Sequence, residues 1–190
     1  MSVNPIYHQN SAKLEEEQGW IRRAQKDPEK FGPLYQKYYE QIFRYIYQRM
    51  DDQELALDVT SQVFMKALKN IKKYEYRGLP LSSWLYRIAK SELHQTFRDQ
   101  KAMRTVNIET VHLTDMVLEM EEEQNLENRD KLFKVLKNLN EKDLQLIELR
   151  YFEKRSYREI GEILELTENN AKVKSYRALE KLKKYFIDKQ

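Results

Sequence analysis

Residues 156–182, SYREIGEILELTENNAKVKSYRALEKL, carry the pattern that most restricts the fold, two amphipathic helices joined by a turn at Glu165 and Leu166. Ser156 stands three residues before Glu159, which is the spacing of a helix-capping box, and Thr167 is placed to cap the second helix. The apolar positions of the second helix recur at helical spacing and include small residues; they are Ala171, Ser175, Ala178, Leu179 and Leu182. Because small residues let two helices approach closely, the pattern predicts a helix-turn-helix.

The opposite face of the second predicted helix is polar and basic. Its candidate binding residues are Asn169, Asn170, Lys172, Val173, Lys174, Tyr176 and Arg177. Amide, guanidinium and ammonium groups on an exposed helix suit the base edges and phosphates of the DNA major groove. We expect Arg155, Arg158 and Lys174 to contact phosphates, which position a protein without specifying sequence. An ordinary helical hairpin with a solvated basic face is the alternative at this point.

The remaining sequence favours an all-α fold with two helical domains and an acidic linker. The 190 residues include four glycines and four prolines, and no alternating apolar run is long enough to predict a sheet. We expect an amino-terminal extension at residues 1–19, a first domain at 20–104, a linker at 105–128 and a second domain at 129–190. The net charge is +5 over residues 1–104, −7 over the linker and +5 over the second domain. Two basic blocks around an acidic connector indicate two modules that face nucleic acid.

Composition also argues against several other classes of protein. The chain has no cysteine, and its three histidines lack the spacing of a metal site, so we expect no cofactor and no bound metal. It contains no glycine-rich phosphate loop and no Ser/His/Asp arrangement, which argues against an enzyme. No apolar run approaches the roughly 18 residues of a membrane span, and the amino terminus lacks a signal-peptide layout. We therefore expect a cytoplasmic protein without membrane insertion.

The first domain shows three helical patterns. Asp27 and Pro28 are expected to open a helix whose buried stripe comprises Phe31, Leu34, Tyr35, Tyr38, Ile42, Tyr45 and Ile46. A second helix is expected to start at Asp51 and Asp52, with apolar positions at Leu55, Val59, Val63, Leu68 and Ile71. Gly78 and Pro80 then interrupt the helical pattern. A third amphipathic helix is expected to begin near Ser83.

Taken together, the two domains resemble a bacterial extracytoplasmic-function (ECF) sigma factor of the sigma-70 family. DPEKFGPLYQKYYEQIFRYI and ELALDVTSQVFMKAL resemble the opening helix and the polymerase-gripping segment of sigma domain two. YRGLPLSSWLYRIAK resembles the strand-opening segment, and residues 129–186 resemble sigma domain four. Each motif is weak alone, but their order and spacing make the combination specific. Glu165 stands where many relatives have glycine, so either its backbone tolerates a left-handed or similar conformation or the turn differs slightly from theirs.

The resemblance implies a function without covalent chemistry, in which the protein directs core RNA polymerase to specific promoters and aids strand opening. The second domain is then expected to read the −35 element and to contact the polymerase flap. Candidates for −10 recognition and melting are Tyr74, Tyr76, Arg77, Gly78, Leu79, Pro80, Trp84, Lys90 and Arg98. For Trp84, packing in the core is an equally good interpretation.

Candidates for contact with the polymerase clamp coiled coil are Asp52, Glu54, Asp58, Gln62 and Phe64. The acidic residues among them also suit simple stabilisation of a helix amino terminus. An anti-sigma factor is a common partner in the family, but no residue of this chain demands one. The competing hypothesis is a stand-alone helix-turn-helix regulator that binds duplex DNA without joining polymerase.

Overall fold

The computed structural model describes residues 11–50, 52–100, 132 and 134–187, and every regular element in these ranges is helical. The expected acidic linker, residues 105–128, lies outside them. The chain divides into two compact units between Thr105 and Val106, and each is described by itself. None of the described helices combines the length and the apolar character needed to cross a membrane.

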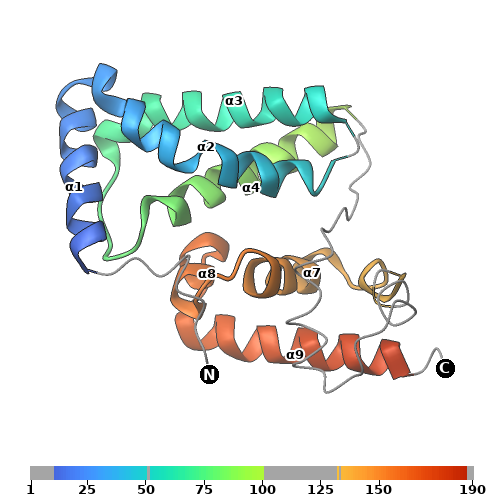
Figure 1. The fold of residues 1–190 in the computed structure, drawn as a ribbon. Coiled ribbons are helices and arrows are strands. Elements are labelled where there is room, and N and C mark those ends of the chain that lie inside the picture. The colour runs from blue at the N-terminus through green and yellow to red at the C-terminus, as the bar shows by residue number, and fades with distance from the viewer. Residues whose placement is uncertain (1–10, 51, 101–131, 133, 188–190) are drawn as a thin grey trace. The chain divides into compact units, whose positions relative to one another are not determined.

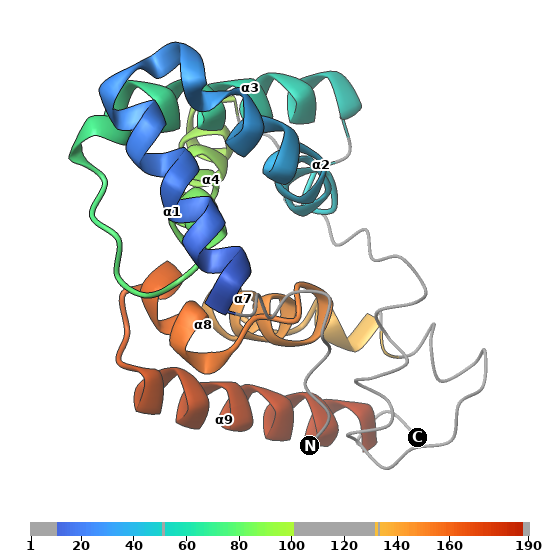
Figure 2. The same cartoon turned by 60° about the vertical axis from the view of Figure 1, so that its left-hand side comes forward.

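The described part of the first unit consists of four α-helices and two short 3-10 turns, whose arrangement is drawn in Figures 1 and 2. In chain order they are α1 (Ser11–Lys26), η1 (Pro28–Phe31), α2 (Gly32–Tyr47), α3 (Gln53–Asn70), η2 (Ile71–Lys73) and α4 (Leu81–Gln100). Helix α3 packs against both α2 and α4, while α1 contacts η1, η2 and α2. The first unit therefore has one core, to which α1 contributes Ile21 and Ala24.

Two helix boundaries differ from the sequence predictions. Helix α1 runs through the boundary expected between residues 19 and 20, so the expected extension and the first domain share one helix. Pro28 opens the 3-10 turn η1 rather than α2, because the Asp27 carboxylate accepts the Glu29 N–H at 3.1 Å and closes a tight turn. Helix α2 starts after that turn, with Pro33 in its first turn.

Most of the apolar stripe predicted for the first domain is buried, with two corrections. Tyr35 is 41% exposed and Leu68 is 38% exposed. Helix α3 instead buries small and polar residues that a hydrophobic pattern overlooks, since Ala56, Thr60 and Ala67 are all 0% exposed. Leu57 and Leu68 each directly follow one of these small buried residues, Ala56 and Ala67, and lie on the exposed side of the helix.

The second unit contains a helical segment at Leu132 and residues 134–136, followed by four named elements. These are α7 (Glu141–Ile147), η3 (Glu148–Phe152, a π-helical turn), α8 (Tyr157–Leu164) and α9 (Glu168–Ile187). The Asn140 side chain accepts the Asp143 N–H at 2.9 Å and so caps α7.

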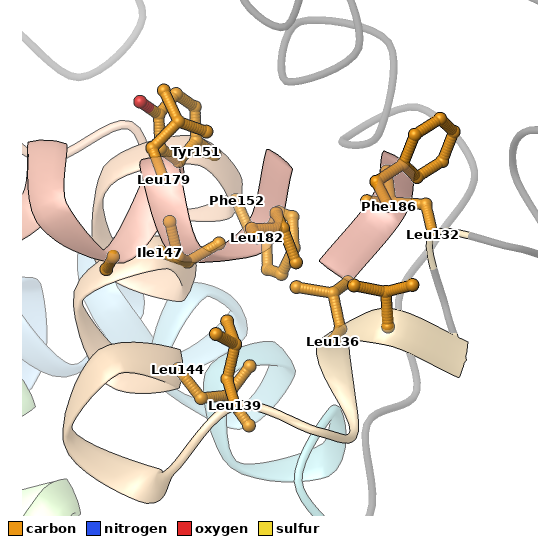
Figure 3. Packing of buried hydrophobic residues seen from close by; sticks show 12 residues of the cluster. Leu132, Leu136, Leu139, Leu144, Ile147, Tyr151, Phe152, Leu179, Leu182 and Phe186 are labelled. Carbon is orange, nitrogen blue, oxygen red and sulfur yellow. The ribbon is translucent and has the colours of Figure 1, made fainter. Parts of the chain in front are cut away.

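One apolar cluster holds the second unit together (Figure 3). Side chains from the segment before α7, from α7 and from η3 meet three large residues of α9, namely Leu179, Leu182 and Phe186. These three are at most 3% exposed. The carboxyl-terminal half of α9 is therefore fixed in the core, and its amino-terminal half packs on α8.

Candidate nucleic-acid interfaces

The amino-terminal half of α9 presents the face that the sequence predicted. All seven candidate residues are exposed: Asn169, Asn170, Lys172, Val173, Lys174, Tyr176 and Arg177. The five positions predicted to face inward, from Ala171 to Leu182, are buried. The Thr167 hydroxyl accepts the Asn170 N–H at 3.2 Å, which confirms the predicted cap. The result is a firmly held helix with amide, basic and aromatic groups pointing outward.

The turn between α8 and α9 is tight. Glu165 has φ 59° and ψ 45°, so the left-handed backbone expected at this non-glycine position is present. The Leu166 N–H donates to the Gly161 carbonyl oxygen at 2.8 Å. A Cβ atom on Gly161 would lie 2.7 Å from the Leu166 carbonyl oxygen and 3.4 Å from the Glu168 nitrogen. Gly161 is therefore required by the close approach of the turn to α8.

The capping box predicted for α8 is present and extends into a buried ion pair. The Ser156 hydroxyl accepts the Glu159 N–H at 3.2 Å, and the Glu159 carboxylate accepts the Ser156 N–H at 2.9 Å. The same carboxylate accepts a hydrogen bond from Arg155 at 3.1 Å, and Arg155 also donates to the Glu153 carbonyl oxygen at 2.7 Å. Arg155 is 1% exposed, so the prediction that it contacts phosphates is wrong. Its role is to fix the chain that leads into α8.

An aromatic group beside α9 was missed by the sequence analysis. The Tyr157 ring lies 6.1 Å from the Tyr176 ring, and the Arg150 guanidinium lies 4.7 Å above Tyr157. Neighbouring Lys154 is partly buried, and this desolvation lowers the pKa of its ammonium. Tyr157 is half-buried, and its position directly after the capping residue Ser156 was the available sequence signal that it lies in the first turn of α8.

In the first unit, the loop at residues 74–80 joins η2 to α4 and contains most of the candidates for −10 recognition. Tyr76 and Arg77 are exposed, and Gly78 has φ 72°, a value that favours glycine. Leu79 is half-buried, and Pro80 is buried. The expectation that Pro80 contacts DNA is therefore corrected: it packs inside and fixes the loop. Tyr76 and Arg77 are exposed to solvent beside Glu75, which is the third exposed side chain of the loop.

The remaining candidates around the loop differ in exposure. Trp84 is half-buried and its ring lies 4.9 Å from the Tyr74 ring, which agrees with the packing interpretation of Trp84. Lys90 is half-buried on α4. Arg98 is exposed and donates to side chains of its own helix, Gln95 and Asp99.

Among the described residues, no group of three or more acidic or histidine side chains is arranged to hold a metal.

Both ends of this loop are bound by α1, which the sequence analysis did not recognise as a helix. The Gln25 amide donates to the carbonyl oxygens of Ile71 at 3.1 Å and Tyr74 at 2.8 Å. The Glu17 carboxylate accepts the Leu81 N–H at 2.6 Å. In both views of the fold the loop runs alongside α1 (Figures 1 and 2). Glu17 and Gln25 therefore belong to the site although they lie far from it in sequence.

The candidate polymerase-binding residues on α3 do not all share one surface. Asp52 caps the helix, since its carboxylate accepts the Leu55 N–H at 3.1 Å, and Glu54, Asp58 and Gln62 are exposed. Phe64 is 4% exposed, so its assignment as a contact residue is corrected. Its ring lies 4.8 Å from the Tyr35 ring and 6.1 Å from the Tyr39 ring.

Helix α2 carries a row of aromatic rings at four-residue spacing beside Phe64. Successive ring centroids from Tyr35 through Tyr39 and Phe43 to Tyr47 are 5.1, 6.3 and 5.6 Å apart. Tyr35 and Tyr47 are exposed at the two ends. Tyr35 was expected in the core, and the row was not predicted from the sequence.

Comparison with known protein families matches both units. The family model for Sigma-70 region 2 matches residues 34–103, and that for Sigma-70, region 4 matches residues 135–184. Loop 74–80 thus falls within the first match, and α8 and most of α9 fall within the second. The two matched regions follow the order predicted from the sequence.

Curated relatives span nearly the whole chain. RNA polymerase sigma factor YlaC of Bacillus subtilis is 30% identical over 158 residues, covering 80% of this chain and 88% of YlaC. ECF RNA polymerase sigma factor SigW of the same organism is 27% identical, and the match covers 88% of this chain and 95% of SigW. ECF RNA polymerase sigma factor BldN of Streptomyces coelicolor is 27% identical, covering 97% of this chain and 70% of BldN.

A solved structure supports the fold independently. CnrH, determined in complex with the cytosolic domain of CnrY, is similar with a TM-score of 0.61 at 16% identity, covering 92% of this chain and 99% of the other. At this identity the likeness concerns the fold alone. With both regional family models and a 30% identical relative matched over most of its length, the chain belongs to the sigma-70 family of RNA polymerase sigma factors, in its ECF group.

Proposed function

We propose that the two surfaces divide promoter recognition, with α9 reading the −35 duplex and loop 74–80 capturing an unpaired base of the −10 element. The observation that carries this proposal is the presence, in one chain, of an exposed polar recognition helix and of an anchored loop that exposes an aromatic ring and a guanidinium. We place this work in the cytoplasm, where polymerase and genome meet. The protein itself catalyses no covalent step in this proposal.

The exposed groups of α9 fit the chemistry of the major groove. Arg177 and Lys172 offer donors for guanine acceptors, and the amides of Asn169 and Asn170 match adenine. Val173 and Tyr176, which are 38% and 39% exposed, offer apolar contact to thymine methyl groups. Lys174 is assigned to phosphates, because a single ammonium positions the helix without reading a base pair.

Loop 74–80 fits the task of trapping a base that has left the duplex. Unstacking a base costs a few kcal/mol, and stacking on an aromatic side chain returns about 1–3 kcal/mol per base. Tyr76 is 38% exposed and is free of the core contact that holds Tyr74 against Trp84. Arg77 supplies a donor for a phosphate or a base edge, and Lys90 and Arg98 extend the basic surface along α4.

Polymerase contact is assigned to α3 in the first unit. Glu54, Asp58 and Gln62 offer polar contacts to the clamp coiled coil, and the exposed apolar residues Leu57 and Met65 lie on the same helix. The second unit is assigned to the flap. Because CnrH was solved in complex with the cytosolic domain of CnrY, we also propose that this fold can accept a protein partner, such as an anti-sigma factor.

In vitro transcription with core polymerase tests the proposal. The purified chain is added to core polymerase with fragments of its own genome, and unpaired thymines are mapped with permanganate. We expect open complexes that need both proteins. Duplex binding by the chain alone, with no effect on polymerase, would favour the stand-alone regulator instead.

A further inference from the structure

Glu17 lies at the centre of a buried hydrogen-bond group inside the first unit. Its side chain is 1% exposed, although it follows two exposed glutamates in the sequence. One carboxylate oxygen accepts from the Lys37 ammonium at 2.6 Å and from the Tyr38 hydroxyl, both on α2. The other oxygen accepts the Leu81 N–H at 2.6 Å. A buried carboxylate held this way connects three helices through charge-assisted hydrogen bonds.

The contact with Leu81 explains why α4 begins where it does. The first N–H groups of a helix have no partner within the helix, and Ser, Thr, Asp or Asn usually supplies a cap. Here the preceding residue is Pro80, whose side chain offers no acceptor, and the Glu17 carboxylate takes that place from α1. Negative charge is also favoured at a helix amino terminus. Helix α4 therefore starts at Leu81, not at the Ser83 expected from the sequence.

Gln25 anchors the other end of loop 74–80 to α1 by hydrogen bonds. Its amide donates to the carbonyl oxygens of Ile71 and Tyr74, the residues that bracket η2. Gln25 and Glu17 are eight positions apart on α1, a helix that also packs against η1 and α2. One rigid helix thus fixes the two ends of the loop at a set separation.

We propose that Glu17 and Gln25 are positioning residues for strand opening: they hold loop 74–80 in the form that receives an unpaired base, without contacting DNA themselves. This inference rests on the proposed function of the loop. A loop ordered before it binds loses less conformational entropy on capture, so its anchors strengthen capture. Releasing either anchor weakens the loop and leaves its exposed groups Tyr76 and Arg77 chemically unchanged.

Matched pairs of substitutions on α1 test the proposal. Glu17→Gln keeps the shape but removes the charge and one acceptor, and Glu16→Gln makes the same change at the exposed neighbour. Gln25→Ala removes the second anchor. Gln18→Ala is its matched control: among the described hydrogen bonds, the Gln18 side chain bonds only to Arg22 of its own helix. Gln25→Ala also keeps the test decisive if Glu17→Gln fails to fold.

Each full-length variant is assembled with core polymerase and measured in three ways. Polymerase affinity and −35 duplex binding report recruitment, permanganate reactivity reports opening, and base preference on a pre-melted promoter reports capture. For Glu17→Gln we expect about a tenfold loss of open complexes, in keeping with loss of a charged hydrogen bond. For Gln25→Ala we expect about a threefold loss. Recruitment should change by less than about twofold, and both control variants should match the unmodified protein.

Base preference on the pre-melted promoter distinguishes a loop-positioning role of Glu17 and Gln25 from a general loss of protein stability. A destabilised protein would lose recruitment, opening and capture together, and saturating protein would restore all three. Positioning instead predicts blurred −10 preference at saturation, with faster hydrogen exchange at the amides of residues 74–81 and unchanged exchange in α3. Unaltered preference and opening in both anchor variants would overturn the inference.

A loop variant keeps this outcome distinct from failure of the proposed function. Tyr76→Ala and Arg77→Ala alter the exposed groups directly and leave both anchors in place. If they impair opening while the α1 variants do not, the loop assignment stands and the inference fails. If neither loop variant affects opening, the proposed function of the loop itself fails.

Discussion

The turn before α9 and the loop before α4 each precede a helix, but their restraints come from different distances along the chain. Ser156, Glu159 and Thr167 hold the ends of α8 and α9 through bonds to residues three positions away. The loop is held by bonds that span 46, 49 and 64 positions, all from α1. The first surface is therefore specified by local sequence, and the second depends on the packing of the whole unit.

The largest effect should come from the local network that supports α8. Arg155→Ala leaves the Glu159 carboxylate buried without its cation, and breaking a buried pair in this way costs about 3–5 kcal/mol. We expect the second unit to lose most of its stability, measured as the shift in its thermal transition. Arg158→Ala, which removes an exposed guanidinium from the next turn, should change stability by less than about 0.5 kcal/mol. Equal effects of the two would show that Arg155 acts at the surface.

A smaller effect is expected where the turn touches α8. Gly161→Ala places a Cβ atom 2.7 Å from the Leu166 carbonyl oxygen, and a backbone shift to relieve this costs about 1–3 kcal/mol. Gly32→Ala is the matched control, because its Cβ meets nothing within 4 Å. Chemical denaturation of both variants checks the difference. A Gly161→Ala protein as stable as the Gly32→Ala protein would contradict the tight turn.

The recognition face itself can be divided by a pair of binding measurements. Arg177→Ala should weaken −35 binding by about 1–3 kcal/mol and shift preference at one or two base positions if the contact is bidentate. Lys174→Ala should weaken binding evenly across sequences and reduce its salt dependence, because it removes a phosphate contact. Titrations with promoter variants at several salt concentrations measure both. An unchanged base preference in Arg177→Ala would mean that α9 meets DNA through another face.

The smallest effect should have the opposite sign. Glu165 adopts a left-handed conformation that glycine accepts at less cost, so Glu165→Gly should stabilise the second unit by about 0.5–1 kcal/mol. The measurement is the midpoint of denaturation, with DNA binding as a control for the unchanged position of α9. A destabilised variant would indicate that the Glu165 side chain contributes a contact that outweighs its backbone strain.

The accuracy of the sequence predictions follows the same division between local and remote restraints. The caps at Ser156 and Thr167 are confirmed, because a capping bond joins residues three apart and leaves a readable spacing. The buried and exposed faces of α9 are confirmed because helical periodicity alone separates them. Arg155 was placed wrongly although its partner Glu159 is only four positions away, since its charge indicated a surface position and the sequence does not show that the pair is buried.

The first unit shows where such reasoning fails. Phe64 and Tyr35 exchange their expected roles, one buried and one exposed, although their rings lie 4.8 Å apart on different helices, a contact that the sequence does not show. Pro80 was identified correctly as a loop residue, but the sequence pattern does not show that it is buried. Glu17 reads as one of three consecutive acidic residues, and nothing in that run distinguishes the buried one.

By itself, the sequence determined the helical class, the helix-turn-helix, the face of α9 and the family, because periodicity, caps and motif order are properties of short segments. Tertiary structure decided that α1 belongs to the first unit, that Glu17 caps α4, and that Gln25 holds the opposite end of the loop. The physical reason is that a hydrogen bond between residues 64 positions apart leaves no spacing to read, and becomes visible only when packing brings donor and acceptor together.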